Sequence, residues 1–457
     1  MERKPPAPLT LGARLAAPVD IASLAVFRIA FGLLMVVHVG TYFATGQLER
    51  QYLTPVFFFK FTGFEWVRPG PPWLMIGVFC GLALAAFFIA LGFFYRGSCA
   101  LFCLGFTYVF LLDEADYQNH LYLIALLAAL LTFLPAHRAF SLDVLRKPAL
   151  RARTVPAWTL WILRFQVAIP YVFGGLAKLN YDWLVRAQPM KLWLQAGPEG
   201  GLQLALLQRE WAAYLMSWAG AGYDLLVVPA LLWRRTRIAA VAATLLFHLL
   251  NSELFTIGIF PWLMLAATTL FFPPDWPRWL GLRLRQPKAA PAEGSESGPP
   301  RHLPRPIAAA LAVWVALQLL LPLRHLLYPG KVDWTEECHQ FSWRMKLRDK
   351  VGTVRFVAVD PSSGRRYPLE GLDAALTARQ RLMMEHDPDM IRQFAVYLGR
   401  KLAESGMGRV EIHAETSISL NARRSQPMVD PAVDLAATPG TWGHSPWIVP
   451  LEDRQPP

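Results

Sequence analysis

The chain has 457 residues, of which 54% are apolar and 17% are charged. This composition excludes a disordered chain and is unusual for a soluble enzyme, so it indicates a membrane protein with several spanning helices. The net charge of +12 is carried by short segments between long apolar runs, as in cytoplasmic loops, so nucleic acid is not a predicted partner.

The first apolar run, residues 22–44, is longer than the core of a cleavable signal peptide, so it is predicted to span the membrane. Eight further runs bring the prediction to about nine membrane helices: 73–94, 97–112, 120–135, 157–178, 210–232, 237–250, 254–272 and 306–323. Some runs are shorter than the ~20 residues of a perpendicular span, and the two runs around Asn251 could instead form one broken hairpin.

The basic residues set the predicted orientation. They gather in residues 138–153, 234–237 and 278–305, whereas 113–119 and 251–253 contain none. Under the positive-inside rule the N-terminus is cytoplasmic. An odd number of helices then places the C-terminal domain outside.

Two domains are predicted, a helical catalytic membrane domain over residues 1–323 and an outward-facing soluble domain over 324–457. Residues 286–305 are rich in Pro, Gly, Ser and Ala without periodicity, so they are predicted to form an inner linker. In the second domain VGTVRFVAV and RVEIHAETSISL alternate as strands do, and 377–404 has an amphipathic helical pattern. The predicted fold class is mainly α, with a small mixed α/β domain whose Pro-rich end, from about residue 424, lacks regular structure.

Lys178 lies at the outer end of the fifth apolar run, in YVFGGLAKLNYDW. A lysine near a helix end commonly extends to the membrane interface. Alternatively, burial favours the neutral amine, so a lysine beside an apolar cavity can act as a base. Gly174 and Gly175, a turn earlier, either leave room for a flat ligand or let neighbouring helices pack closely.

His120 follows Asn119 at the predicted outer mouth of the fourth run, in LLDEADYQNHLYL. A histidine at such a position is commonly an interfacial or capping residue. With the predicted topology, however, His120, Lys178 and the group of His248 and Asn251 all lie at outer helix ends. Buried polar residues are costly in a membrane, so several on one side indicate a cavity that they line.

Arg28 and Arg164 lie in the inner thirds of the first and fifth runs, where each is expected either to form a structural pair or to hold a polar ligand group. No metal is predicted, because the four cysteines form no Cys-x-x-Cys pair and His120 and His248 have no H-x-x-x-H spacing. The absence of G-x-G-x-x-G, Walker and G-x-S-x-G motifs argues against nucleotide binding and serine hydrolysis.

Three long stretches carry a family resemblance: NHLYLIALLAALLTFLPAHRAFSLD, YVFGGLAKLNYDW and FHLLNSELFTIGIF. Together they resemble the vitamin K-dependent gamma-glutamyl carboxylase family, in the form of its bacterial homologues with an HTTM-type membrane domain. The resemblance continues through VDWTEECHQFSWRMKLRDK and covers nearly the whole chain. It implies a multi-pass protein of a bacterial inner membrane, with lipid and a Glu-containing peptide or protein as partners.

The resemblance implies a carboxylase and epoxidase of the carbon-carbon lyase class. In this family reduced vitamin K, the hydroquinone, is deprotonated and oxygenated by O2, and the strongly basic intermediate removes a proton from the γ-carbon of a peptide glutamate. CO2 then adds to the carbanion, and the quinone leaves as its 2,3-epoxide. Oxidation of the cofactor must drive this step, since no amine or carboxylate of ordinary pKa removes so weakly acidic a proton.

The resemblance also implies roles for single residues. Lys178 matches the lysine that deprotonates the hydroquinone, a role that requires it to rest unprotonated, and His120 matches the histidine that positions or protonates an intermediate. The remaining candidates are expected to line the quinone or glutamate pocket: Asn119, Gly174, Gly175, His248, Asn251, Arg28 and Arg164.

One departure weakens the resemblance, because Ala177 precedes Lys178 where the family often has a second lysine. Two alternatives to the carboxylase stay open. One is a quinone epoxidase that does not carboxylate glutamate, and the other is a non-catalytic membrane binding protein or transporter.

Overall fold

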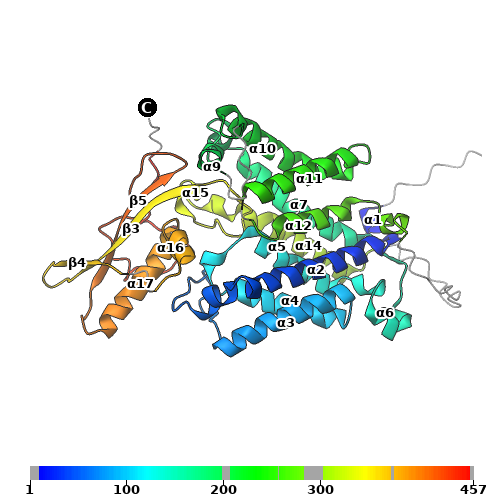
Figure 1. Ribbon diagram of the computed structural model, residues 1–457, viewed down its shortest axis with the longest axis horizontal. Coiled ribbons are helices and arrows are strands. Elements are labelled where there is room, and N and C mark those ends of the chain that lie inside the picture. Colours follow the sequence, from blue (N-terminus) through cyan, green and yellow to red (C-terminus); the bar gives the residue numbers. More distant parts are fainter. Residues whose placement is uncertain (1–9, 198–205, 256, 282–301, 372–374, 453–457) are drawn as a thin grey trace, which may run out of the picture.

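The computed structural model describes residues 10–197, 206–255, 257–281, 302–371 and 375–452. Each predicted apolar run contains a helix (Figure 1): α2 (Ala22–Ala44), α3 (Pro72–Leu91), α4 (Tyr95–Phe110), α5 (Asn119–Phe133), α7 (Trp158–Lys178), α10 (Glu210–Leu232), α11 (Arg237–Leu254), α12 (Phe260–Thr268) and α14 (Arg305–Leu320). Most of the predicted linker, residues 286–305, lies outside the described residues.

Fewer helices have the length and hydropathy of a membrane span than the nine that the sequence predicts. Five helices in the described residues are long and apolar enough to cross a membrane: α2, α3, α7, α10 and α14 with its extension to Leu327. The mainly helical, apolar character of the region is confirmed, whereas the count of nine spans is not. Around Asn251, α11 continues to Leu254 and α12 begins at Phe260, and these two consecutive helices contact each other.

Short elements connect the long helices. β1 (Pro18–Asp20) pairs antiparallel with β2 (Thr154–Pro156), which ties the start of α2 to the start of α7. The short helices of this region are α1 (Leu11–Ala16), α6 (Leu142–Arg146), α8 (Tyr181–Leu184), α9 (Met190–Ala196) and α13 (Trp276–Trp279). A π-helical turn lies at Glu49–Leu53, and 3-10 turns lie at Glu114–Asp116, Ala136–Arg138, Pro148–Leu150, Thr269–Phe271 and Leu321–Leu327.

Glycines let the long helices approach each other closely. A Cβ atom on Gly32 of α2 would lie 2.4 Å from the backbone nitrogen of Ala90 on α3. A Cβ atom on Gly175 of α7 would lie 2.8 Å from Cγ of Leu225 on α10. The hydrophobic effect does not drive membrane helices together, because lipid is also apolar. Small residues let the backbones approach closely, so van der Waals packing holds the helices together.

The C-terminal domain contains a three-stranded antiparallel sheet in the order β4-β3-β5. Its strands are β3 (Lys350–Val359), β4 (Arg366–Leu369) and β5 (Glu411–Leu420), and its helices are α15 (Val332–Thr335), α16 (Ala378–Met384) and α17 (Pro388–Glu404). The apolar face of α17 covers the sheet, where the rings of Phe394 and Phe356 lie 5.5 Å apart. The two predicted strands are therefore confirmed.

The predicted helical stretch 377–404 forms two helices instead of one continuous helix. The division follows from Asp387 and Pro388. The carboxylate of Asp387 accepts hydrogen bonds from the first backbone N–H groups of α17, and Pro388 occupies the first helical position, where its missing N–H has no cost. After β5 the described chain forms only isolated bridges, as predicted, while Met428, Val429 and Trp447 are buried in the domain core.

The segment between α14 and β3 joins the two regions. Phe341 and Trp343 from this segment lie 4.8 and 5.0 Å from the ring of Tyr122 on α5. In the opposite direction, Phe59 from the loop after α2 is buried in the core of the C-terminal domain. Figure 1 shows the sheet at one end of the helical bundle, with α15 and α16 between them.

Candidate active site

Lys178 is the last residue of α7, and its side chain is buried with 8% exposed. Its Nζ donates a hydrogen bond of 2.6 Å to Oδ2 of Asp224 on α10, whose side chain is 5% exposed. Nζ also lies 5.4 Å from the ring centroid of Trp183 on α8. The side chain of Lys178 is therefore buried against protein atoms, although it stands at a helix end.

Gly174 and Gly175 allow this pair to form. The Cβ position of Gly174 lies 3.2 Å from Cε of Met345 and 3.5 Å from Oδ2 of Asp224. Side chains at these positions would push α10 and the 341–347 segment away from α7. In this structure the glycines make room for neighbouring protein atoms, and their place beside a ligand stays a prediction.

A second polar contact lies two turns earlier on α7, about 10 Å from Lys178 along the helix axis. The hydroxyl of Tyr171 lies 2.8 Å from Nε2 of His248 on α11, and the hydroxyl of Tyr223 on α10 donates to Tyr171 at 3.4 Å. Tyr223 and Asp224 are consecutive residues of α10, so this helix contributes one residue to each of the two contacts. The Tyr223 ring stacks on Phe247 at 4.0 Å.

His120 lies in the first turn of α5 and is buried. Its ring centroid is 6.0 Å from that of Phe260, at the start of α12, and Phe260 is 5.9 Å from the ring of His248. Phe260 thus stands next to both histidines. The structure therefore brings His120 and His248 into one neighbourhood, with Tyr171 connecting it to α7.

Asn119 and Asn251 make local hydrogen bonds. Oδ1 of Asn119 accepts from the Tyr117 hydroxyl at 3.0 Å, and that hydroxyl accepts from the backbone N–H of Phe341 at 2.7 Å. Nδ2 of Asn251 donates to the Phe247 carbonyl within α11 at 2.8 Å. Asn119 therefore helps to fix the segment that joins the two domains.

Arg28 and Arg164 bind backbone carbonyls. Nη2 of Arg28 donates to the Phe140 carbonyl at 2.5 Å. Nε of Arg164 donates to the Leu270 carbonyl at 2.7 Å, next to the end of α12. Nε and Nη1 of Arg28 are buried without a hydrogen-bond partner among the described residues, so both roles expected from the sequence stay open. In the described part of the chain no contact links either arginine to Lys178, His120 or His248.

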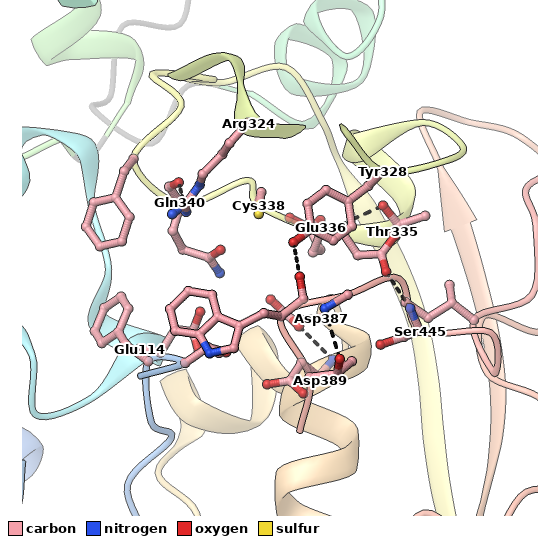
Figure 2. A pocket seen from close by; sticks show the side chains of 18 of the residues that line it. Glu114, Arg324, Tyr328, Thr335, Glu336, Cys338, Gln340, Asp387, Asp389 and Ser445 are labelled. Carbon is pink, nitrogen blue, oxygen red and sulfur yellow. Dashed lines mark hydrogen bonds between the residues drawn. The ribbon is translucent and has the colours of Figure 1, made fainter. Parts of the chain in front are cut away.

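Among the cavities formed by the described residues, two that lie between the membrane region and the C-terminal domain are lined by neither Lys178 nor His120. The first, of about 150 Å³, is shown in Figure 2, with Arg324 and Asp389 on opposite sides. Its acidic lining residues are Glu114, Glu336, Glu337, Asp387 and Asp389. The second, of about 300 Å³, has Lys346, Arg348, Lys350, His339 and His386 among its lining residues.

The charges around these cavities are partly neutralised. Oε1 of Glu336 accepts hydrogen bonds from Nζ of Lys350 at 2.5 Å and from Nε of Arg348 at 2.6 Å. Burial, with Glu336 and Asp389 nearby, raises the pKa of Asp387 to about 7. Burial, with Asp387 as the next cause, raises the pKa of Glu114 well above its usual range. Burial therefore favours the protonated form of both carboxyl groups.

The sequence contained a signal for one residue that the prediction missed. Asp224 lies inside an apolar run, where a carboxylate is costly and needs a partner. Lys178 is such a partner, but sequence alone does not show that α7 and α10 are neighbours. No comparable signal marked Tyr171, because a tyrosine in a membrane helix is ordinary.

The fold and these residues define a multi-helix membrane protein with a buried lysine–aspartate pair and an α/β domain at one end of the bundle. The HTTM domain family matches residues 16–276 of the chain. The family described as vitamin K-dependent gamma-carboxylase, lumenal domain, matches residues 304–454. The chain therefore belongs to the vitamin K-dependent gamma-carboxylase family, which confirms the resemblance found in the sequence. It matches no solved structure.

Family membership indicates a carboxylase-like membrane protein and implies vitamin K hydroquinone, O2, CO2 and a Glu-containing substrate. Among the described residues, no group of three His, Cys, Asp or Glu side chains is placed to hold a metal ion. That the protein needs no metal for its reaction remains a prediction.

Proposed function

We propose that this chain is an integral-membrane vitamin K-dependent gamma-glutamyl carboxylase. It would couple oxygenation of vitamin K hydroquinone to its epoxide with the addition of CO2 to the γ-carbon of a peptide glutamate. The observation that carries the proposal is the burial of Lys178, which matches the family lysine, beside Trp183 and against Asp224. The two family matches along the chain support it.

The quinone ring would bind beside Tyr171 and His248. Nδ1 of His248 is buried and has no hydrogen-bond partner among the described residues, so it is free to bind a ring hydroxyl. The aromatic rings of Tyr223, Phe247 and Phe260 lie within 6.3 Å of the His248 ring, and a flat apolar ligand would pack against such rings. The bound hydroquinone would supply the oxidative chemistry, together with O2.

The protein would contribute three things to this reaction. Lys178 would receive the proton of a hydroquinone hydroxyl, and His120 would act on the carboxylation half of the reaction. The apolar helices would exclude water, which otherwise quenches a strong base. With the predicted orientation, the C-terminal domain and the peptide substrate lie outside a bacterial inner membrane, and the N-terminus is cytoplasmic.

The test follows both halves of the reaction in purified protein. The protein is incubated with reduced vitamin K, labelled bicarbonate and a Glu-containing peptide, and the epoxide and the fixed label are measured separately. Both products are expected. Epoxide without fixed label would identify a quinone epoxidase. If neither product forms, the remaining interpretation is a binding protein or transporter.

Two variants connect this assay to the site. Lys178→Ala is expected to abolish epoxide formation in folded protein, because it removes the proton acceptor. The matched control is Lys401→Ala, since Lys401 is half exposed on α17 and pairs with Glu404 on the surface. His120→Ala is expected to reduce the fixed label. If Lys178→Ala still forms epoxide at the control rate, the assignment of Lys178 is wrong.

A further inference from the structure

Asp224 and Lys178 form a buried ion pair in which each side chain compensates the charge of the other. In the described residues, Asp224 is the one hydrogen-bond partner of Lys178 Nζ, at 2.6 Å. Both side chains are buried, so water does not compensate either charge. Removing one partner of a buried pair leaves an uncompensated charge, which is strongly unfavourable.

This pairing changes what Lys178 needs in order to act as a base. A lone lysine must rest as the free amine, because an ammonium group cannot accept another proton. An ammonium group that is hydrogen-bonded to a carboxylate has a second route. It can pass its own proton to the carboxylate while it receives one from the substrate.

We propose that Asp224 is the final proton acceptor for the hydroquinone and that Lys178 relays the proton. This inference rests on the proposed function, because it concerns the same reaction. In the resting state Lys178 is an ammonium group and Asp224 a carboxylate. As the hydroquinone O–H bond breaks, its proton binds Nζ of Lys178, and an Nζ proton moves to Oδ2 of Asp224.

The proton and charge balance of this step is complete. The electron pair of the broken O–H bond stays on the substrate oxygen, which becomes negative. The pair changes from zero net charge to +1, so the new negative charge lies beside a new positive one in a region of low dielectric. No oxidant or reductant is needed, and O2 enters only afterwards.

The position of Asp224 suits this role. Oδ2 lies 2.6 Å from Nζ of Lys178 and 3.5 Å from the Cβ position of Gly174. The neighbouring Tyr223 contacts Tyr171, which in turn contacts His248. Asp224 is therefore connected through Tyr223 and Tyr171 to His248, where the quinone ring is proposed to bind. We treat it as a positioning and proton-accepting residue.

The test is carried out without oxygen, so that proton transfer is separated from later chemistry. Infrared difference spectra are recorded when reduced vitamin K is added to the purified protein. We expect a carboxylic acid C=O band to appear on binding, to shift in Asp224→Glu and to be absent in Asp224→Asn. A band that is already present before addition would overturn the relay, because Asp224 would then hold a proton at rest. A band unaffected by substitution at 224 would also overturn it.

Turnover provides the second measurement. Asp224→Asn is expected to lower kcat for epoxide formation on the order of 10²-fold or more, with KM for the hydroquinone changed little, and Asp224→Glu is expected to restore part of the rate. The control is Asp20→Asn, which removes the carboxylate that Arg278 binds at 2.7 Å. This variant should keep normal turnover. A purely structural Asp224 would instead lower the amount of folded protein and leave turnover per folded molecule near normal.

These measurements separate the two proposals. If the unmodified protein neither binds reduced vitamin K nor forms epoxide, the proposed function fails. If it does both but residue 224 has no effect on the infrared band or on kcat, only the role of Asp224 fails. If Asp224→Asn does not fold, the shift of the band in Asp224→Glu still decides the question.

Discussion

Nε2 of His248 and the hydroxyl of Tyr171 lie 2.8 Å apart, and this contact joins α11 to α7 inside the helical bundle. The other ring nitrogen of His248 has no partner among the described residues. The imidazole is therefore held by a single hydrogen bond. Its orientation, and with it the direction of the free Nδ1, depends on Tyr171.

Tyr171→Phe should destabilise the protein by about 1 kcal/mol, because it leaves both His248 nitrogens without a protein partner. The measurement is the free energy of unfolding in detergent micelles, as part of a double-mutant cycle with His248→Leu. A coupling energy of about 1 kcal/mol is expected, since the two residues share one contact. Additive effects would show that the hydrogen bond contributes nothing to stability.

The close packing of α2 on α3 gives a prediction about Gly32. Gly32→Ala should destabilise by about 1–3 kcal/mol, because the new Cβ would lie 2.4 Å from a backbone nitrogen, which cannot move aside as a side chain can. Gly40 lies on the same helix with nothing within 4 Å of its Cβ position, so Gly40→Ala is the matched control. Thermal melting of the two purified variants checks the difference. Equal melting temperatures would contradict the packing argument.

Much of the fold could be predicted from the sequence because hydrophobic periodicity is a local property. The apolar runs, the two long strands and the irregular chain end after about residue 424 all agree with the structure. The helix boundaries were less predictable. α11 ends at Leu254 and α12 begins at Phe260, whereas the predicted runs end at residue 250 and begin at residue 254.

The candidate site was predictable only in part, for a physical reason. Lys178, His120 and His248 are polar residues in apolar surroundings, and that contrast is visible in a sequence. Their partners depend on which helices are neighbours. The sequence therefore did not show that Asp224 binds Lys178, or that Arg28 and Arg164 bind carbonyls at other helix ends.

The junction between the domains gives a prediction about pH. Asp387 faces Glu336, Asp389 and Lys350, and its pKa is raised from 3.8 to about 7, with burial as the largest cause. The folded protein thus binds more protons at this site than the unfolded chain between pH 3.8 and about 7. The contribution of Asp387 to stability must therefore fall as the pH rises through this window, and it stays lost above it.

Asp387→Asn should remove this dependence and make the protein more stable than the parent at pH 8. Asparagine is as good an N-cap as aspartate, so it can keep the hydrogen bonds from the N–H groups of Asp389 and Met390. Asp387→Ala loses the cap and should cost about 1 kcal/mol relative to Asn at every pH. Melting temperatures of the three proteins between pH 5 and pH 8 test this. A parent and an Asn variant with parallel pH profiles would contradict it.

Replacing Lys178 by arginine separates charge from proton transfer. Lys178→Arg should keep the fold, because a guanidinium group can still bind the Asp224 carboxylate at the end of α7. It should nevertheless lower the rate of epoxide formation by on the order of 10²- to 10⁴-fold. The reason is that guanidinium does not release its proton at any accessible pH, so it can neither act as a free base nor pass a proton to Asp224.

The measurement is the epoxide formed per folded molecule, with folding checked by thermal melting and gel filtration. Lys401→Arg is the control, because it makes the same chemical change on the exposed face of α17 and should leave the rate unchanged. A Lys178→Arg variant that forms epoxide at the control rate would show that the site needs a positive charge beside Asp224. Both the free-base role and the relay would then be wrong, because neither works without a transferable proton on residue 178.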